Sequence, residues 1–242
     1  MDAASVITPR LTNGPWLASD ASIIALSVQV ALVSVCLSLP AAIGLAWLLA
    51  RRNFPGKVLL DALVHLPLVL PPVVTGYMLL SCFGRSGWLG PLLEPLGIRL
   101  YFSWRGAAVA SAVMSFPLML RAIRLSMEAA DPRMEKMART LGASAWATFL
   151  EVTLPAAAPG IAGGVLLGFT RSLGEFGATI SFVGNLPDET RTLPLAIFDA
   201  LQSPDGESQA LRLSIYAFLL AAGSLIASET LAARQRRQRD PA

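Results

Sequence analysis

Two pairs of ionisable residues lie in otherwise apolar stretches of the sequence. Arg171 and Glu175 are four residues apart, as are Asp61 and His65, so each pair shares one face if its segment is helical. A charge within a membrane span indicates a functional site, because an unpaired charge is expensive to bury there. For Arg171 and Glu175 we favour a structural ion pair and keep contact with a substrate open. For Asp61 and His65 we expect a hydrogen-bonded pair.

The sequence offers few residues for other chemistry. His65 is the single histidine, which makes a metal site a poor interpretation. Cys36 and Cys82 have neither the spacing of a metal site nor that of a disulfide framework. A membrane enzyme would need a constellation such as H-E-x-x-H, clustered acids or a Ser/His pair near an interface. With His65 as the single histidine, we predict no catalytic and no metal-binding residue. Because no G-x-x-x-x-G-K-[ST] loop occurs, we expect this chain to bind no nucleotide.

The composition predicts a membrane protein. The chain has 242 residues, of which 54% are hydrophobic and 14% charged, whereas about a quarter of residues are charged in soluble domains. Its mean hydropathy is +0.59 and its pI is about 9.2. The basic residues lie between and after the apolar segments instead of forming one stripe, so we expect the lipid bilayer and no nucleic acid as a partner.

Five apolar segments are long enough to cross a membrane, which takes roughly 20 helical residues. They cover residues 21–50, 58–82, 104–127, 156–183 and 211–232. The sequence therefore predicts an all-α integral membrane protein with about five transmembrane helices. We expect residues 1–242 to form a single transmembrane domain.

The basic residues predict the orientation, since lysine and arginine are enriched in short cytoplasmic loops. They gather in the first connection, in the third connection and in the C-terminal tail. These residues are Arg51, Arg52 and Lys57, then Arg121, Arg124, Arg133, Lys136 and Arg139, and finally Arg234, Arg236, Arg237 and Arg239. We expect the N-terminus outside, the C-terminus inside and the connection 128–155 in the cytoplasm.

The connection 128–155 begins with a predicted amphipathic helix. Its apolar residues recur at helical spacing and are Met134, Met137, Ala138 and Leu141. Glu135 and Arg139 stand four residues apart in the order that supports a helix. Two interpretations are open: a helix that lies in the membrane interface, or one that docks into a groove of a soluble partner.

A second short helix follows in the same connection. Gly142 interrupts the first pattern and Ser144 can cap a new helix. Trp146, Phe149 and Leu150 then repeat the spacing of one helical face. We expect Pro155 to end this helix before the fourth span.

The spacing in this connection resembles the cytoplasmic signature of ATP-binding-cassette (ABC) importer permeases. Gly142, Val152, Leu154 and Pro155 match its glycine, nine residues, an aliphatic residue, one residue and Leu-Pro. Lys136, Met137 and Ala138 take the place of its Glu-Ala-Ala, and Glu135 lies beside them. The resemblance implies a coupling helix between spans 3 and 4 that sits in a cleft of an ATPase subunit. The implied coupling residues are Glu135, Ala138, Leu141, Gly142, Ala143, Ser144, Trp146, Phe149, Leu154 and Pro155.

Four further stretches resemble the permease subunits of molybdate importers. They are HLPLVLPPVVTGY (65–77) and the segments 103–125, 171–185 and 187–194. Runs like RSLGEFGA (171–178) also occur in sulfate-type permeases. The resemblance implies the transmembrane subunit of an oxyanion importer, with molybdate as the first choice. The alternatives are a sulfate/thiosulfate or tungstate importer.

The resemblance also implies the partners and the location. We expect two ABC ATPase subunits that hold ATP and Mg, a second copy of the permease in a homodimer, and a periplasmic substrate-binding protein. The assembly would lie in the bacterial inner membrane, with this chain as a multi-pass subunit. No cofactor is expected on this chain itself.

The second and fourth spans are the candidates for the translocation path. Pro67, Pro71 and Pro72 are expected to break the hydrogen-bond ladder of the second span, so that freed carbonyls are satisfied by neighbouring side chains or a water-lined cavity. Gly174 and Gly177 permit bending or close approach of the fourth span. The candidate path or gate residues are Pro71, Pro72, Thr75, Arg171, Ser172, Gly174, Glu175, Gly177 and Thr179.

A different class, an ion-coupled secondary carrier, is the remaining alternative. Such carriers show paired repeats and intramembrane carboxylates. Only Glu175 and Asp61 qualify as such carboxylates, and no repeat is visible. We therefore place the carrier behind the importer.

Overall fold

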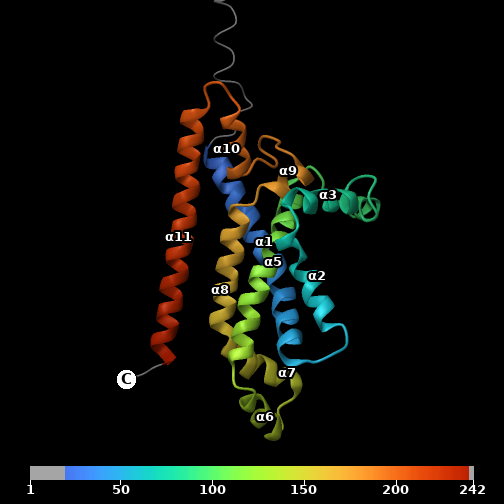
Figure 1. Cartoon of the computed structure of the whole chain (residues 1–242), viewed down its shortest axis with the longest axis vertical. Helices are drawn as coiled ribbons and strands as arrows, with labels where there is room; N and C mark the ends of the chain where they lie inside the picture. Colours follow the sequence, from blue (N-terminus) through green and yellow to red (C-terminus); the bar gives the residue numbers. More distant parts are fainter. Residues whose placement is uncertain (1–19, 240–242) are drawn as a thin grey trace, which may run out of the picture.

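The computed structural model describes residues 20–239, and within that range every regular element is helical. Four long helices run along the long axis of the molecule (Figure 1). They are α1 (Asp20–Arg51), α5 (Trp104–Ala129), α8 (Leu154–Leu173) and α11 (Glu207–Arg239). Each belongs to a helical stretch that is long and apolar enough to cross a membrane. The predicted segments 21–50, 104–127 and 211–232 coincide with α1, α5 and α11.

The second predicted span is two helices, α2 (Lys57–Val69) and α3 (Pro72–Phe83), with a bend of 113° between them. Leu70 lies at the bend in an extended conformation, with φ −69° and ψ 142°. A proline disfavours helical geometry in the residue before it, so Pro71 fixes the bend, and Pro72 begins α3. Pro67 stays inside α2, where it has no N–H to donate and interrupts the hydrogen-bond ladder without ending the helix. With α2 and α3 as one broken span, the described residues contain up to 5 spans.

The fourth predicted span, 156–183, was also wrong as one continuous helix. Helix α8 ends at Leu173, and the separate helix α9 (Gly177–Val183) follows. Helix α9 crosses α3 so closely that a Cβ on Gly76 would lie 2.5 Å from the Ala178 carbonyl oxygen. A Cβ on Gly177 would lie 2.7 Å from the Cβ of Pro72. Glycine therefore permits this crossing from both sides.

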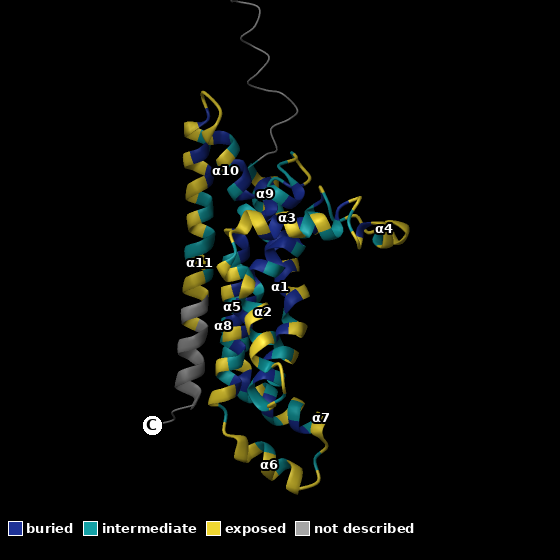
Figure 2. Cartoon of the chain, turned by 45° about the vertical axis from the view of Figure 1, so that its right-hand side comes forward, coloured by how far each residue is buried: buried dark blue, intermediate teal, exposed yellow. Residues whose placement is uncertain are grey.

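Helices α1, α5 and α8 form the main packed core (Figure 2). Leu49, Met119 and Ile123 are fully buried in it, and Ala42 and Ala46 bring α1 close to its neighbours. On α8, a Cβ at Gly168 would meet the Met119 side chain at 2.6 Å. Small residues suit a membrane bundle, because lipid supplies no hydrophobic force between helices and close packing must hold them.

The connection between α5 and α8 contains α6 (Pro132–Thr140), α7 (Ala145–Thr148) and a π-helical turn (Phe149–Thr153). The expectation that Pro155 ends the second short helix was wrong, because the helical stretch continues from Ala145 to Leu173. Pro155 has no N–H to donate one turn back. The turn before it is widened, and the N–H of Leu154 donates to the carbonyl of Phe149, five residues earlier.

The other end of the bundle carries shorter elements. Helix α4 (Gly90–Leu93) and a 3-10 turn (Glu94–Leu96) project sideways beyond α3 (Figure 2). Helix α10 (Leu193–Leu201) leads into α11 and is tied to α1, because the N–H of Leu193 donates to the Ser27 hydroxyl at 2.8 Å. The last described turn of α11 returns to the end of the molecule where α6 and α7 lie (Figure 1).

Candidate functional site

The predicted coupling segment is a compact helix–turn–helix at one end of the bundle. Asp131 caps α6 by accepting from the N–H of Arg133 at 2.8 Å, and Ser144 caps α7 by accepting from the N–H of Ala147 at 3.1 Å. Gly142 turns the chain between them with φ +93°, a left-handed conformation that favours glycine. The helix–glycine–helix arrangement and the Ser144 cap are as the sequence predicts.

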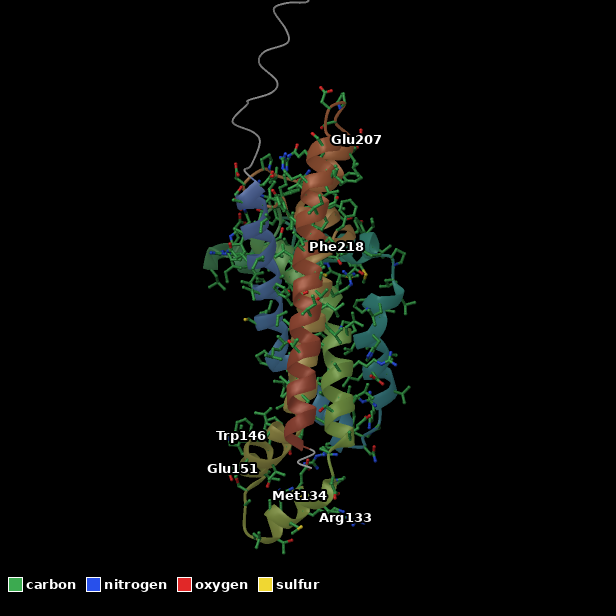
Figure 3. The ribbon with its side chains drawn as sticks, turned by 90° about the vertical axis from the view of Figure 1, so that its left-hand side faces the viewer. Arg133, Met134, Trp146, Glu151, Glu207 and Phe218 are labelled. Carbon is green, nitrogen blue, oxygen red and sulfur yellow. The ribbon has the colours of Figure 1, made fainter. Side chains whose placement is uncertain are left out.

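Helix α6 presents apolar and basic side chains to the outside. Met134, Met137 and Leu141 are exposed, and Leu141 has 86% of its surface accessible. Arg133 and Lys136 line a shallow groove together with Met137, Thr140 and Leu141. Figure 3 places Arg133 and Met134 farther out along the molecule than Trp146 and Glu151. This tip, defined by Met134, Met137 and Leu141, is an uncovered apolar surface of the kind that binds a partner.

Trp146 and Phe149 differ in their surroundings, although the sequence gives them the same role. Phe149 packs edge-on against Trp47 of α1, with ring centroids 6.0 Å apart. Trp146 stacks on the outer side of Phe149 at 5.6 Å and keeps 68% of its surface exposed. Phe149 therefore joins α7 to the bundle, whereas Trp146 leaves most of its ring exposed.

The remaining predicted coupling residues lie within the fold of this segment. Leu154 and Pro155 are part of the first turn of α8. The N–H of Ala143 donates to the carbonyl of Ala138 at 3.0 Å, which closes the turn after α6. Glu135 points inward, and its Oε1 accepts from Arg51 Nε at 2.9 Å and from the Thr153 hydroxyl at 3.0 Å. Sequence reasoning did not identify Arg51 and Thr153 as its partners.

Arg171 and Glu175 form the predicted ion pair, with 2.7 Å between Nη1 and Oε2. Glu175 is only 2% exposed, and its Oε1 also accepts from the N–H of Ala178 at 2.8 Å. Its carboxylate thus neutralises Arg171 and caps the first turn of α9. This accounts structurally for a carboxylate at the break between α8 and α9.

The other predicted path residues do not all gather around this pair. Pro72 and Gly177 meet at the crossing of α3 and α9. Ser172 instead faces α1, and its hydroxyl lies 2.7 Å from that of Ser34. Thr179 donates to the carbonyl of Phe176 at 2.8 Å.

Three more predicted path residues have simple surroundings. Thr75 is buried in α3, and its hydroxyl has no hydrogen-bond partner within the part of the chain that the structure describes. Gly174 and Pro71 are the residues at the two helix breaks.

Asp61 and His65 lie together as predicted, within a larger group between α2 and α5. Their hydrogen bond runs to the Asp61 backbone carbonyl, and Asp61 Oδ1 has no hydrogen-bond partner among the described residues. His65 Nδ1 lies 3.3 Å from Asp61 Oδ1 and 2.8 Å from the Asp61 carbonyl. Arg124 donates to Asp61 at 2.9 Å and to Glu128 at 2.8 Å. Arg121 lines the same groove, whose volume is about 490 Å³. The four-residue spacing of Arg124 and Glu128 could have revealed their pair, whereas the contact across to α2 carried no local signal.

No group of three potential metal ligands occurs among residues 20–239. Many polar side chains described there form ion pairs or helix caps with other groups of the same chain. The two ends of α8 thus carry the candidate coupling contacts and the candidate path contacts.

Comparison with known proteins gives a consistent set of relatives. The model of the family described as "Binding-protein-dependent transport system inner membrane component" matches residues 20–239. The chain is 55% identical over 223 residues to the molybdenum transport system permease protein ModB of Escherichia coli (strain K12), covering 92% of this chain and 95% of that one. It is 52% identical over 220 residues to the protein of the same name from Haemophilus influenzae, covering 90% and 96%.

More distant relatives extend the picture. The sulfate transport system permease protein CysT of E. coli (strain K12) is 42% identical over 182 residues, which cover 75% of this chain and 65% of that one. Among solved structures, a bacterial ABC transporter for the import of alginate has a TM-score of 0.70 and 15% identity, with 90% of this chain and 80% of that chain covered. At that identity the likeness concerns the fold alone.

Proposed function

The chain belongs to the family of binding-protein-dependent transport system inner membrane components, and from that premise we propose that it carries molybdate across the bacterial inner membrane as the permease of an ATP-driven importer. It is a multi-pass membrane protein and an ABC importer permease. The assignment of molybdate as the substrate rests on sequence identity. The chain is 55% identical to a molybdenum permease over 95% of that protein, but only 42% identical to a sulfate permease over 65% of that protein.

Separate ATPase subunits drive the permease from the end that carries α6 and α7. The support is the surface of Met134, Met137 and Leu141, which this chain leaves uncovered, because an amphipathic helix with a free apolar face suits a groove on a partner. Two ATPase subunits, each with ATP and Mg, and two copies of the permease complete the symmetric assembly. A periplasmic binding protein delivers the anion at the opposite end.

The orientation proposed from the basic residues is N-terminus out and C-terminus in. The ends of α1 and α11 that carry these residues lie at the same end of the molecule as α6 and α7 (Figure 1). One cytoplasmic end therefore accounts for both the charge distribution and the coupling segment.

Helix α8 connects the two functions of the permease. Its helical stretch begins at Ala145 in the coupling segment and ends at Leu173, beside Arg171 and Glu175. Movement of α7 by the ATPase subunits is passed along this stretch to the break before α9. Because Glu175 neutralises Arg171, no strong fixed positive charge holds the anion there, which favours its release.

The test is uptake of labelled molybdate by cells with and without this chain, at low external molybdate and with a large excess of sulfate. We expect deletion to remove an uptake that resists sulfate. Molybdate uptake that persists while sulfate uptake falls would replace the proposal by a sulfate importer. If neither uptake changes, the assignment to these oxyanions fails.

A further inference from the structure

One carboxylate joins three separate elements at the coupling end. Glu135 of α6 accepts at the same Oε1 from Arg51 Nε, at 2.9 Å, and from the Thr153 hydroxyl, at 3.0 Å. Arg51 Nη2 also donates to the carbonyl of Ala130, at 3.2 Å, where the chain leaves α5. The end of α1, the start of α6 and the π-helical turn before α8 therefore meet at Glu135. We call Arg51, Glu135 and Thr153 the Glu135 clamp.

The clamp is the main side-chain attachment of α6 to the bundle. No residue of α6 is buried, so apolar packing does not fix this helix. The side chains of Arg51 and Glu135 are only 12% and 19% exposed, and partial shielding from water strengthens charge-assisted hydrogen bonds. A polar contact thus attaches α6 to the bundle, whereas packed apolar side chains hold α1, α5 and α8 together.

The position of Thr153 gives the clamp a functional meaning. Thr153 is the last residue of the π-helical turn, and π-helical turns inside α-helices occur often at functional sites. At this turn the coupling helix α7 continues into the membrane-spanning helix α8. Glu135 therefore holds α6 against the point where motion of the coupling segment enters the span.

The signature resemblance makes this use of Glu135 unexpected. Lys136 stands where the signature has its glutamate, and the structure leaves Lys136 exposed. Glu135, one residue earlier, turns inward to Arg51 and Thr153. The Glu135 carboxylate of α6 thus makes a contact within the chain.

We propose that Glu135 is a positioning residue that makes α6, α7 and the ends of α1 and α8 move together when the ATPase subunits move. Without the clamp, α6 would be linked to the bundle mainly by the turns at Ala130–Asp131 and at Gly142, and its movement would be lost at these turns. Glu135 contacts neither nucleotide nor transported anion in this role. The coupling role of Glu135 rests on the proposed function, whereas the existence of the clamp can be tested on this chain alone.

The first test is hydrogen exchange of the purified permease in nanodiscs. Glu135→Gln keeps the size of the side chain and removes its charge, and Thr153→Val removes only the hydroxyl donor. We expect exchange in α6 to become about tenfold faster in Glu135→Gln and to change less in Thr153→Val, with α5 unaffected. The matched control is Glu151→Gln, which removes an exposed carboxylate in the same π-helical turn. Unchanged exchange of α6 in Glu135→Gln would overturn the clamp.

The second test is the number of molybdate ions transported per ATP hydrolysed by the reconstituted complex. We expect Glu135→Arg or Arg51→Glu to lower this ratio about fivefold, while the complex stays assembled. The double variant Arg51→Glu/Glu135→Arg restores the ion pair with reversed charges and should recover part of the ratio, which a general loss of stability would not allow.

The outcomes separate the inference from the function on which it rests. If the wild-type complex transports no molybdate, the proposed function fails, and the exchange of α6 still decides whether the clamp exists. If the exchange rises but the ratio stays constant in all variants, the clamp does not transmit motion and the inference is wrong.

Discussion

The two ends of α8 each carry an Arg–Glu ion pair beside an irregular turn, and they differ in what the pair connects. Arg171 and Glu175 lie four residues apart, 2.7 Å from each other, and close a break between consecutive helices. Arg51 and Glu135 are separated by 84 residues and join α1 to α6 at 2.9 Å. The first pair shapes one stretch of chain at the candidate path, and the second ties the coupling segment to the bundle.

The largest effect is expected at Glu175, whose carboxylate is buried, although Arg171 keeps 28% of its side chain exposed. Glu175→Ala leaves Arg171 without its partner and the N–H of Ala178 without its acceptor. We expect a loss of about 3 kcal/mol in the free energy of unfolding, because removal of one member of a buried ion pair strands the other. Thermal unfolding of the purified permease measures this. The control is Glu189→Ala, at an exposed residue between α9 and α10. An equal loss of stability in both variants would show that the Arg171–Glu175 pair does not stabilise the fold.

A smaller loss is expected where α9 crosses α3. In Gly76→Ala the new Cβ would lie 2.5 Å from the Ala178 carbonyl oxygen and 2.8 Å from the Ser181 Cβ. Overpacking of this kind costs about 2 kcal/mol. Gly163→Ala, where a Cβ meets nothing within 4 Å, should leave the unfolding temperature unchanged or slightly higher. Equal behaviour of the two variants would refute the close crossing.

At the coupling end, two aromatic substitutions should separate folding from partner binding. Phe149→Ala removes the contact with Trp47 and should lower stability by about 1 kcal/mol, less than for a fully buried ring. Trp146→Ala should leave stability nearly unchanged and weaken binding of the ATPase subunits about tenfold, as for an exposed aromatic anchor. Thermal unfolding and co-purification measure the two effects. Reversed results would show that Phe149 is the ring that faces the partner.

The smallest effect is expected at Thr75. Its buried hydroxyl has no hydrogen-bond partner within residues 20–239, so Thr75→Val removes no hydrogen bond among these residues. We expect the free energy of unfolding to change by less than about 1 kcal/mol. A large loss of molybdate uptake with unchanged stability would identify the hydroxyl as a contact outside this chain, whereas a large loss of stability would contradict the described surroundings.

The sequence predicted the elements of this structure that depend on local patterns. Hydropathy located α1, α5 and α11, and four-residue spacing identified both the Arg171–Glu175 and the Asp61–His65 pairs. Gly142 and Ser144 marked the turn and the cap of the coupling segment. These features arise from neighbours along the chain, where helix geometry fixes which side chains meet.

The features that sequence reasoning missed depend on packing between distant segments. The apolar segment 156–183 was predicted as one span, so the break between α8 and α9 at Gly174–Phe176 was missed. Three prolines between residues 67 and 72 predicted a break but did not show that Pro67 is tolerated inside α2. The contact between Glu135 and Arg51 could not be predicted either. The two residues meet only because the end of α1 and the start of α6 lie at the same end of the bundle.

We expect this chain to pass molybdate only when separate ATPase subunits drive it. The most direct measurement is the accumulation of labelled molybdate in proteoliposomes that contain the permease alone or the permease with the ATPase subunits and the binding protein, with and without ATP. We predict accumulation only in the complete system with ATP. Accumulation by the permease alone in response to a proton or sodium gradient would contradict the account and identify the chain as an ion-coupled carrier.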